Sequence, residues 1–317
     1  MKPIHAQDTM VMDLRLPKKT QPCYKWIVIT LSLITFLLFC VTVFFHFSAI
    51  QNATENGMFK NGIDTVSDKF ALDITPADYT FIIQLAIIYI WQAAWIIYVL
   101  TSLCRRNQYG AVFTNPPIVT PFFLMSFCLH LWLNIMWLFL FDSKLIVWSF
   151  ICSFLMYFTL EFPVLMSHHV AVHKYGKQLK KDHKVDRFAI RILIQNGLAL
   201  YRTWIVFATI LNFCTVLTYE GNVTRSTSST VGLVIVAVFV ILDFIIGTTI
   251  WDKYQRYTFS NWGVYIWVLI GILVDNWDAS NRNSVITLVL LFVCIIFVAI
   301  KIPLTKWRHR NKPLYVV

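Results

Sequence analysis

Three ionisable residues lie inside stretches that are otherwise apolar: Glu161, Arg202 and Asp243. A charged side chain costs roughly 2.5 to 3.5 kcal/mol at the centre of a membrane span, so such residues face protein or water and mark ion pairs or ion pathways. Asp243 is twelve residues into its apolar stretch, close to the expected middle of a membrane. We expect it to be protonated, to pair with Arg202 or His130, or to bind a cation. Arg202 either pairs with Glu161 or extends its guanidinium to lipid headgroups.

Amide and indole side chains recur at helical spacing in two other apolar stretches. Within 84–95, two glutamines, Ile88 and two tryptophans follow steps of three and four, and a serine, a histidine, an asparagine and a tryptophan do the same within 126–137. Such spacing places each set on one side of a helix. The stripes either line a ligand cavity or join helices by hydrogen bonds worth about 0.6 kcal/mol each. Our candidate ligand-binding residues are Gln84, Trp91, Gln92, Trp95, His130, Asn134, Trp137, Trp204, Asn212 and Trp262.

Residues that carry catalysis in known motifs do not occur at the required spacings. The chain contains no nucleophile triad, phosphate loop or dinucleotide fingerprint. His169 and His173 are four residues apart, but no carboxylate or thiolate completes a metal site with them. We therefore expect no bound metal, and nothing in the sequence argues for an enzyme.

The elements that must position these side chains are apolar segments long enough to cross a bilayer. Hydrophobic residues make up 58% of the 317 residues and charged residues 14%, a composition typical of membrane proteins. A span needs about 20 mostly apolar residues. We predict an all-α polytopic transmembrane bundle of about eight spans, or seven if one of the last two is lost. The predicted spans are 25–48, 79–103, 118–140, 145–166, 192–218, 231–251, 259–276 and 285–304.

Charge predicts which ends of these spans face the cytoplasm. With the N-terminus inside, 21 of the 27 Lys and Arg residues fall on the cytoplasmic side and five outside, as the positive-inside rule requires. Two glycosylation sequons, at Asn52 and Asn222, fall in outside loops, whereas no cysteine does. We predict cytoplasmic termini and a plasma-membrane or secretory-pathway location. The parts outside the spans are an N-terminal tail (1–24), an outer acidic loop (49–78), a basic cytoplasmic loop (167–191) and a basic C-terminal tail (305–317).

The net charge of +11 is concentrated in the loops and tails beside the spans. Topology accounts for this distribution, which predicts contact with anionic inner-leaflet lipid and not with nucleic acid. The outer loop has the opposite character, with five acids against two lysines. Such a loop could bind cations or a partner, although a solvated acidic loop is the commoner structure.

Several runs of the sequence resemble the tryptophan-rich sensory/translocator (TspO/MBR) proteins, namely "TPADYTF", "IIYIWQAAWIIY", "NGLALYRTWIVFATILNF" and "TFSNWGVYIWVLIGI". Pro76 and Phe81 match that family's proline-led aromatic helix start, and Trp204 and Asn212 match a later helix. The resemblance covers about residues 74–275. It implies a helical bundle that binds tetrapyrroles or sterols in an aromatic cavity, with transport, sensing or porphyrin breakdown as family roles.

The chain departs from the pattern of that family in three ways. About eight spans replace five, Gln84 or Leu85 stands where the helix-start tryptophan is expected, and the sequons indicate a secretory route rather than mitochondria. A shared architecture does not fix the ligand or the role. We therefore expect a small hydrophobic ligand, bound and transported or sensed, in a cavity among spans two, three, five and seven. The alternatives are a channel or cation-coupled transporter that uses Asp243, and a membrane receptor; homo-oligomerisation is left open.

Overall fold

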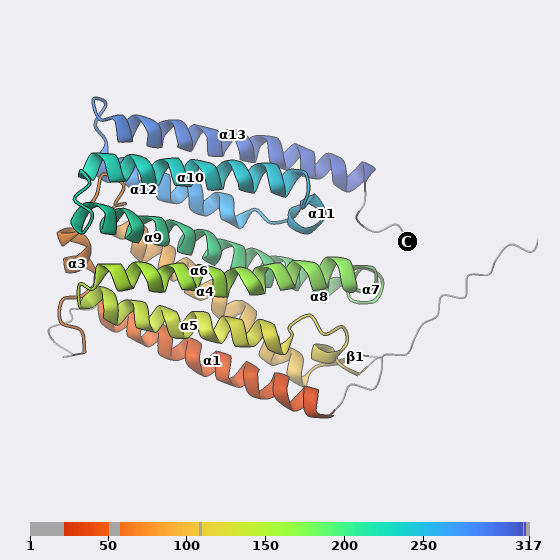
Figure 1. The fold of residues 1–317 in the computed structure, drawn as a ribbon. Coiled ribbons are helices and arrows are strands. Elements are labelled where there is room, and N and C mark those ends of the chain that lie inside the picture. The colour runs from red at the N-terminus through yellow and green to blue at the C-terminus, as the bar shows by residue number, and fades with distance from the viewer. Residues whose placement is uncertain (1–21, 51–57, 108–109, 313, 315–317) are drawn as a thin grey trace, which may run out of the picture.

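The computed structural model describes residues 22–50, 58–107, 110–312 and 314. Over these ranges the chain forms a bundle of long helices joined by short elements at its two ends (Figure 1). The eight long helices are α1 (Pro22–Ile50), α4 (Asp78–Cys104), α5 (Pro121–Asp142), α6 (Ile146–His169), α9 (Gly197–Tyr219), α10 (Arg225–Thr248), α12 (Ser260–Asn276) and α13 (Arg282–Asn311).

Short elements connect the long helices, and most of them are helical as well. The basic loop predicted at 167–191 is largely made of helical turns, and α13 continues past residue 304 through basic residues to Asn311. The short elements are α3 (Ile63–Lys69), the antiparallel pair β1 (Arg106–Asn107) and β2 (Gly110–Ala111), η1 (Val112–Thr114), the π-helical turns η2 (Val170–Lys174) and η3 (Ile190–Asn196), α7 (Gly176–Asp182), α8 (Lys184–Ala189) and α11 (Asp252–Gln255).

Capping residues decide where several long helices begin. Thr120 precedes α5, and its Oγ1 accepts a hydrogen bond from the Phe123 N–H at 3.3 Å. Pro121 then occupies the first helical position, where a missing N–H costs no helical hydrogen bond. Thr224 caps α10 through its side chain in the same way. Because of this cap, α10 begins at Arg225, six residues before the predicted start at 231.

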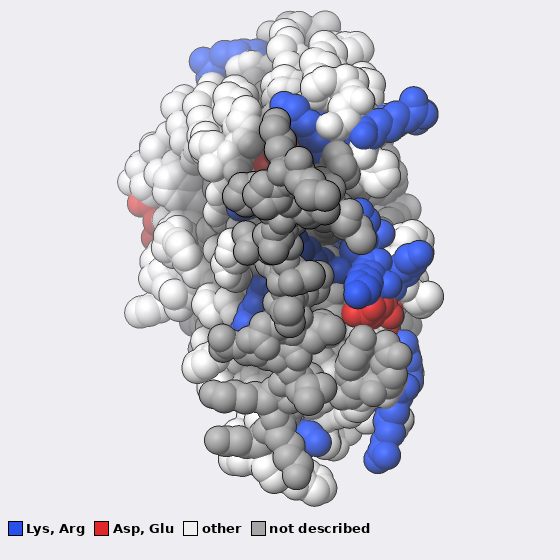
Figure 2. Space-filling view, turned by 90° about the vertical axis from the view of Figure 1, so that its right-hand side faces the viewer, with Lys and Arg blue, Asp and Glu red and all other residues white. Residues whose placement is uncertain are grey.

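Successive long helices run antiparallel along the bundle (Figure 1). Both described ends of the chain lie at the end of the bundle that carries α7 and α8, which we call the basic end. Figure 2 looks onto this end and shows Lys and Arg side chains gathered on it. The opposite end carries α3 and is called the α3 end. The structure thus separates the two faces as the charge pattern predicts, while the assignment of the basic end to the cytoplasm stays a prediction.

All eight predicted segments are helical, and seven of the described helices are long and apolar enough to cross a membrane. The eighth, α12, has 17 residues, or about 26 Å of helix at 1.5 Å per residue. It packs against α9 and α13. The prediction of eight or seven spans therefore depends on the short α12, whereas α13 extends over 30 residues.

The helix α9 occupies the centre of the bundle and packs against α4, α6, α10 and α12. Fourteen of its residues are buried, on all sides of the helix. A helix buried all round must satisfy its polar side chains through neighbouring helices. Four polar residues of α9, Tyr201, Arg202, Thr209 and Asn212, belong to the sites described below. Of the predicted glycosylation sites, Asn222 is exposed just after α9, and Asn52 lies outside the described residues.

Candidate ligand-binding site

A cavity lies inside the bundle beneath α3. Its volume is about 100 Å³, counted as the space open to the centres of water-sized molecules. The helices α1, α3, α4, α5, α6 and α9 line it, and α9 contributes a stripe from Tyr201 to Thr215 at steps of three and four. Among the described residues, α12 contributes nothing to the lining. Span seven, which we predicted to line the ligand cavity, therefore does not line this one; α12 packs against α9 elsewhere.

Aromatic rings form the walls of this cavity. The ring of Phe81 on α4 meets Trp204 on α9 edge to face, with centroids 5.3 Å apart and planes at 82°. On α5, Trp137 stacks on Phe141 with centroids 4.9 Å apart. These rings present apolar surface and negative π-faces to the interior. The walls can therefore hold an apolar body or a cation placed over a ring.

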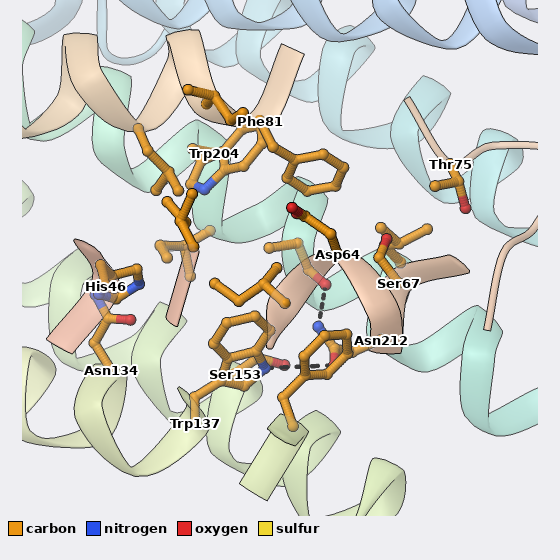
Figure 3. Close-up of a pocket in the computed structure, with 18 of the residues that line it drawn as sticks. His46, Asp64, Ser67, Thr75, Phe81, Asn134, Trp137, Ser153, Trp204 and Asn212 are labelled. Atoms are coloured by element: carbon orange, nitrogen blue, oxygen red, sulfur yellow. Dashed lines mark hydrogen bonds between the residues drawn. The ribbon is translucent and has the colours of Figure 1, made fainter. Parts of the chain in front are cut away.

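Three polar side chains form a group on one side of the cavity. Asn134 on α5 donates from Nδ2 to Oη of Tyr201 on α9 at 2.6 Å. His46 on α1 is 4% exposed, and its Nδ1 lies 3.2 Å from the carbonyl of Thr42. Among the described residues, Nε2 of His46 has no hydrogen-bond partner. Figure 3 shows His46 and Asn134 on the side of the cavity away from Asp64 and Ser67. This polar group offers hydrogen bonds to one hydroxyl or carbonyl of a ligand.

A second set of hydrogen bonds fixes the wall between α5, α6 and α9. Trp137 donates from Nε1 to Oδ1 of Asn212 at 3.4 Å, and Asn212 donates from Nδ2 to the carbonyl of Ala208 at 2.7 Å (Figure 3). Thr209 donates to the carbonyl of Ser153 at 3.1 Å. Asn212 therefore holds the Trp137 indole in place and has its own amide satisfied.

The segment that includes α3 covers part of the cavity at the α3 end. Asp142, at the end of α5, accepts hydrogen bonds from the backbone N–H groups of Lys60, Asn61 and Gly62 at 2.9, 2.8 and 3.0 Å. Gly62 then turns the chain into α3 at a φ of 77°, a conformation that favours glycine. The Asp142 carboxylate thus ties α3 to α5, and α3 extends over the cavity.

Two acids mark where the cavity reaches the surface. Asp64 on α3 and Asp78 at the start of α4 both line it and are both exposed. Partial burial, and the nearby Asp68 carboxylate, raise the pKa of Asp64. The lining also contains His46 and Tyr201, and no described lining residue is a Lys or an Arg. The mouth of the cavity is therefore acidic.

Four of the ten predicted ligand-binding residues line the cavity: Asn134, Trp137, Trp204 and Asn212. The predicted stripe on α4 does not line the cavity. Its residues Trp91 and Gln92 instead contact the backbone of Ile192 in η3 and of Gly197 at the start of α9. Gln92 donates from Nε2 to the carbonyl of Gly197 at 3.0 Å and accepts from Nε1 of Trp95 at 2.6 Å. Trp91 donates from Nε1 to the carbonyl of Ile192 at 2.9 Å. These three residues lie in contacts between helices rather than in the cavity.

The remaining three predicted residues, Gln84, His130 and Trp262, are buried outside the cavity lining. Each has one buried nitrogen without a hydrogen-bond partner among the described residues. His130 lies behind the polar group: its ring meets Tyr201 edge to face at 4.7 Å, and its Nδ1 lies 3.1 Å from the carbonyl of Met156. Gln84 and Trp262 lie elsewhere on α4 and α12.

The three predicted ionisable residues form one cluster, closer to the basic end. Arg202 donates from Nη2 to both carboxylate oxygens of Asp243, at 3.0 and 2.9 Å, and its Nη1 lies 3.6 Å from Glu161. Tyr265 and Asn261 donate to the same carboxylate at 3.0 and 3.3 Å. Two of the predicted alternatives are confirmed: Asp243 pairs with Arg202, and Arg202 pairs with Glu161.

The depth of Asp243 differs from the prediction. Because α10 begins at Arg225, Asp243 is the nineteenth of its 24 residues and lies near the basic end, not at the middle. A fourth charge, Lys301 on α13, is 3% exposed and donates from Nζ to the carbonyl of Thr258 at 2.7 Å. Lys301 also interacts electrostatically with Asp243. Buried charges of both signs therefore lie close together in this part of the bundle.

Sequence reasoning missed most of the cavity lining, including its polar residues His46, Asp64, Asp78 and Tyr201. His46 is an ionisable residue in an apolar run, four residues before the end of α1, and the cost of such a residue in a span was a usable signal. Asp64 belongs to the acidic loop whose charge we noted, but no periodicity in the sequence indicated that α3 folds over the bundle. Short elements of this kind are placed by tertiary contacts such as those of Asp142.

Comparison with known proteins assigns the chain to a family. A family model described as TSPO-like protein matches residues 30–302, a range that extends from α1 into α13. Searches among curated proteins and among solved structures found no match. The match and the apolar helices together show a multi-pass integral membrane protein. The chain belongs to the TSPO-like protein family.

Proposed function

We propose that this protein binds a small, mostly apolar ligand in the cavity beneath α3. The observation that carries the proposal is a cavity with aromatic walls and one group of polar side chains, inside the region that matches the family. Binding sites for small molecules have this composition, in which apolar surface supplies affinity and a few polar groups fix orientation. Transport or sensing of the bound molecule is the role that the family resemblance implies.

The two ligand classes that the family resemblance implies fit the cavity differently. A sterol has an apolar body and one hydroxyl, which matches the polar group of His46, Asn134 and Tyr201. Biological tetrapyrroles carry carboxylates, which need cationic partners when they are buried. The described lining provides Asp64 and Asp78 and no Lys or Arg. The residues present therefore do not fit a tetrapyrrole.

Tryptophan quenching tests the proposed binding. The full chain in lipid nanodiscs would be titrated with a nitroxide-labelled decyl chain that ends in a hydroxyl. Binding in the cavity predicts a saturable quenching component that excess unlabelled decanol removes, whereas partition into lipid gives a component that does not saturate. Trp204→Phe and Trp137→Phe should each reduce the saturable amplitude, because both indoles line the cavity.

The matched control is Trp307→Phe. Trp307 is 51% exposed on α13 at the basic end, far along the bundle from α3. Its removal should change only the part of the quenching that does not saturate. The absence of a saturable component in the unmodified protein, or an amplitude that survives in both Trp204→Phe and Trp137→Phe, would contradict binding in this cavity.

The alternative of a cation or proton pathway through Asp243 has weaker support. Both oxygens of Asp243 accept hydrogen bonds, from Arg202, Tyr265 and Asn261. A carboxylate that is occupied in this way is suited to joining helices, and it has little capacity left for a passing ion. The contacts therefore favour a positioning role for Asp243.

A further inference from the structure

The acidic mouth and the polar group of the cavity together define a ligand class, and this step rests on the proposed function. We propose that the cavity selects cationic amphiphiles, with the positive headgroup between Asp64 and Asp78 at the mouth and the apolar body against the aromatic walls. Carboxylate-bearing amphiphiles are excluded.

The charge of the lining is the first observation. Asp64 and Asp78 come from different elements, α3 and α4, and both reach the cavity and the solvent. They interact electrostatically with each other, and Asp68 and Asp275 add to the same negative field. Like charges that converge at a mouth raise the local concentration of cations and repel anions. A bound cation would relieve the repulsion between them.

The interior of the cavity supplies the second, independent observation. Nε2 of His46, a 4% exposed residue of the lining, has no hydrogen-bond partner among the described residues. The His46 side chain is buried, but this nitrogen keeps accessible surface and is not fully enclosed by protein. A polar group of a ligand can therefore complete it. The site therefore has a position inside for a hydroxyl or carbonyl of the ligand, in addition to the acidic position at the mouth.

Aromatic rings near the mouth suit a cation as well. Phe70 and Phe81 line the cavity together with the two acids. The ammonium of Lys69, which is not a lining residue, already lies 5.4 Å from the centroid of the Phe70 ring. Quaternary ammonium groups bind over such rings when carboxylates are close. Substituted ammonium headgroups are therefore favoured over metal cations, which prefer oxygen ligands alone.

The test uses three nitroxide-labelled decyl probes that differ only in the headgroup: trimethylammonium, hydroxyl or carboxylate. The full chain is held in nanodiscs of zwitterionic lipid, and saturable quenching of Trp137 and Trp204 gives each dissociation constant. We expect the trimethylammonium probe to bind about tenfold more tightly than the carboxylate probe, since each exposed carboxylate contributes up to about fivefold. Asp64→Asn with Asp78→Asn should bring the two constants within about twofold, and Asp64→Asn alone should give an intermediate ratio.

The matched control is Glu220→Gln, which removes an exposed acid at the same end of the bundle outside the cavity lining. It should keep the preference for the cation. The inference is overturned if the carboxylate probe binds as tightly as the cation, or if the preference persists without Asp64 and Asp78. In those cases saturable binding of the hydroxyl probe still supports the proposed function. If none of the three probes gives saturable quenching, the proposed function fails and this inference fails with it.

Discussion

The guanidinium of Arg202 on α9 donates to both carboxylate oxygens of Asp243 on α10, at 3.0 and 2.9 Å. Two residues of α12 donate to the same carboxylate, and Glu161 on α6 lies 3.6 Å from the other guanidinium nitrogen. Four helices therefore meet at one ion-paired cluster near the basic end. The cluster and the cavity are separate sites on the same central helix, because Arg202 and Tyr201 point to different sides of α9.

Asp243→Asn should destabilise the protein by about 3 to 5 kcal/mol, because it leaves the buried Arg202 guanidinium with only the more distant Glu161. The measurement is unfolding of the purified protein in mild detergent. Arg202→Met combined with Asp243→Leu should cost less than Asp243→Asn alone, since it leaves no unpaired cation. An Asp243→Asn protein that is as stable as the wild type but has lost a pH-dependent current would favour the carrier role instead.

Gln92→Leu should lower stability by about 1 to 3 kcal/mol, because it leaves the buried Trp95 N–H and the Gly197 carbonyl without their partner. Gln84→Leu is the matched control on the same helix. Its Nε2 is buried without a partner, so its removal should be neutral or stabilising. The unfolding assay described above measures the stability of both variants. An equal loss of stability in Gln92→Leu and Gln84→Leu would show that Gln92 does not join the helices.

These two glutamines show which features of α4 could be predicted from the sequence and which could not. Helical spacing correctly placed the Gln84 to Trp95 stripe on the inner side of α4, since Gln84, Gln92 and Trp95 are all buried. It could not distinguish a cavity from a helix contact, because both bury the same residue types at the same spacing. That choice depends on which helix approaches the stripe. In the structure the approach of Gly197 and Ile192 fills the space beside Gln92 and Trp91.

The helix segments were predictable for a different reason. Each is a long apolar run, and the structure has a helix at all eight. Helix ends were less predictable, as α10 shows: its polar first turn is helical because Thr224 caps it, although hydropathy alone begins the span at 231. The displaced end moved Asp243 away from the middle of the helix. The position of α3 was not predictable, since it depends on backbone contacts with Asp142 across about 80 residues.

Asp142→Ala should loosen the segment that carries α3. The substitution leaves three backbone N–H groups without their charged acceptor, and hydrogen bonds to a charged group are worth about 1.5 to 3 kcal/mol each. Hydrogen exchange should therefore accelerate in residues 60–70 but not in the middle of α5. Ligand affinity should fall as well, because α3 lines the cavity. Unchanged exchange in that segment would contradict an anchoring role for Asp142.

Gly271→Ala should weaken the packing of α12 on α4. A methyl group at residue 271 would lie 2.6 Å from Cγ2 of Thr80, which is closer than carbon atoms approach without displacement. Gly263→Ala on the same helix meets no atom within 4 Å, and should stabilise the helix by up to about 1 kcal/mol. Opposite shifts in Tm are expected for the two variants. A loss of stability in Gly263→Ala as large as that in Gly271→Ala would show that close contact at residue 271 is not the cause.

Binding of a cationic probe should strengthen with rising pH. Partial burial and the neighbouring Asp68 raise the pKa of Asp64 above its ordinary value of 3.8. Below that pKa the neutral carboxyl offers no charge to a cation, and above it the carboxylate does, so affinity rises as Asp64 loses its proton and then levels off. The other charged groups around it are Asp78 on α4 and Asp68 and Lys69 on α3.

The check is a titration of the trimethylammonium probe from acidic to neutral pH, in which the affinity rises above the ordinary carboxyl pKa as Asp64 loses its proton. In Asp64→Asn, the rise of affinity with pH that is due to Asp64 should disappear. Any rise that remains belongs to another group of the lining, such as His46. The hydroxyl probe, which carries no charge, should show no rise that depends on Asp64. An affinity for the cation that falls as pH increases, or a rise that Asp64→Asn leaves intact, would exclude Asp64 as a partner of the headgroup.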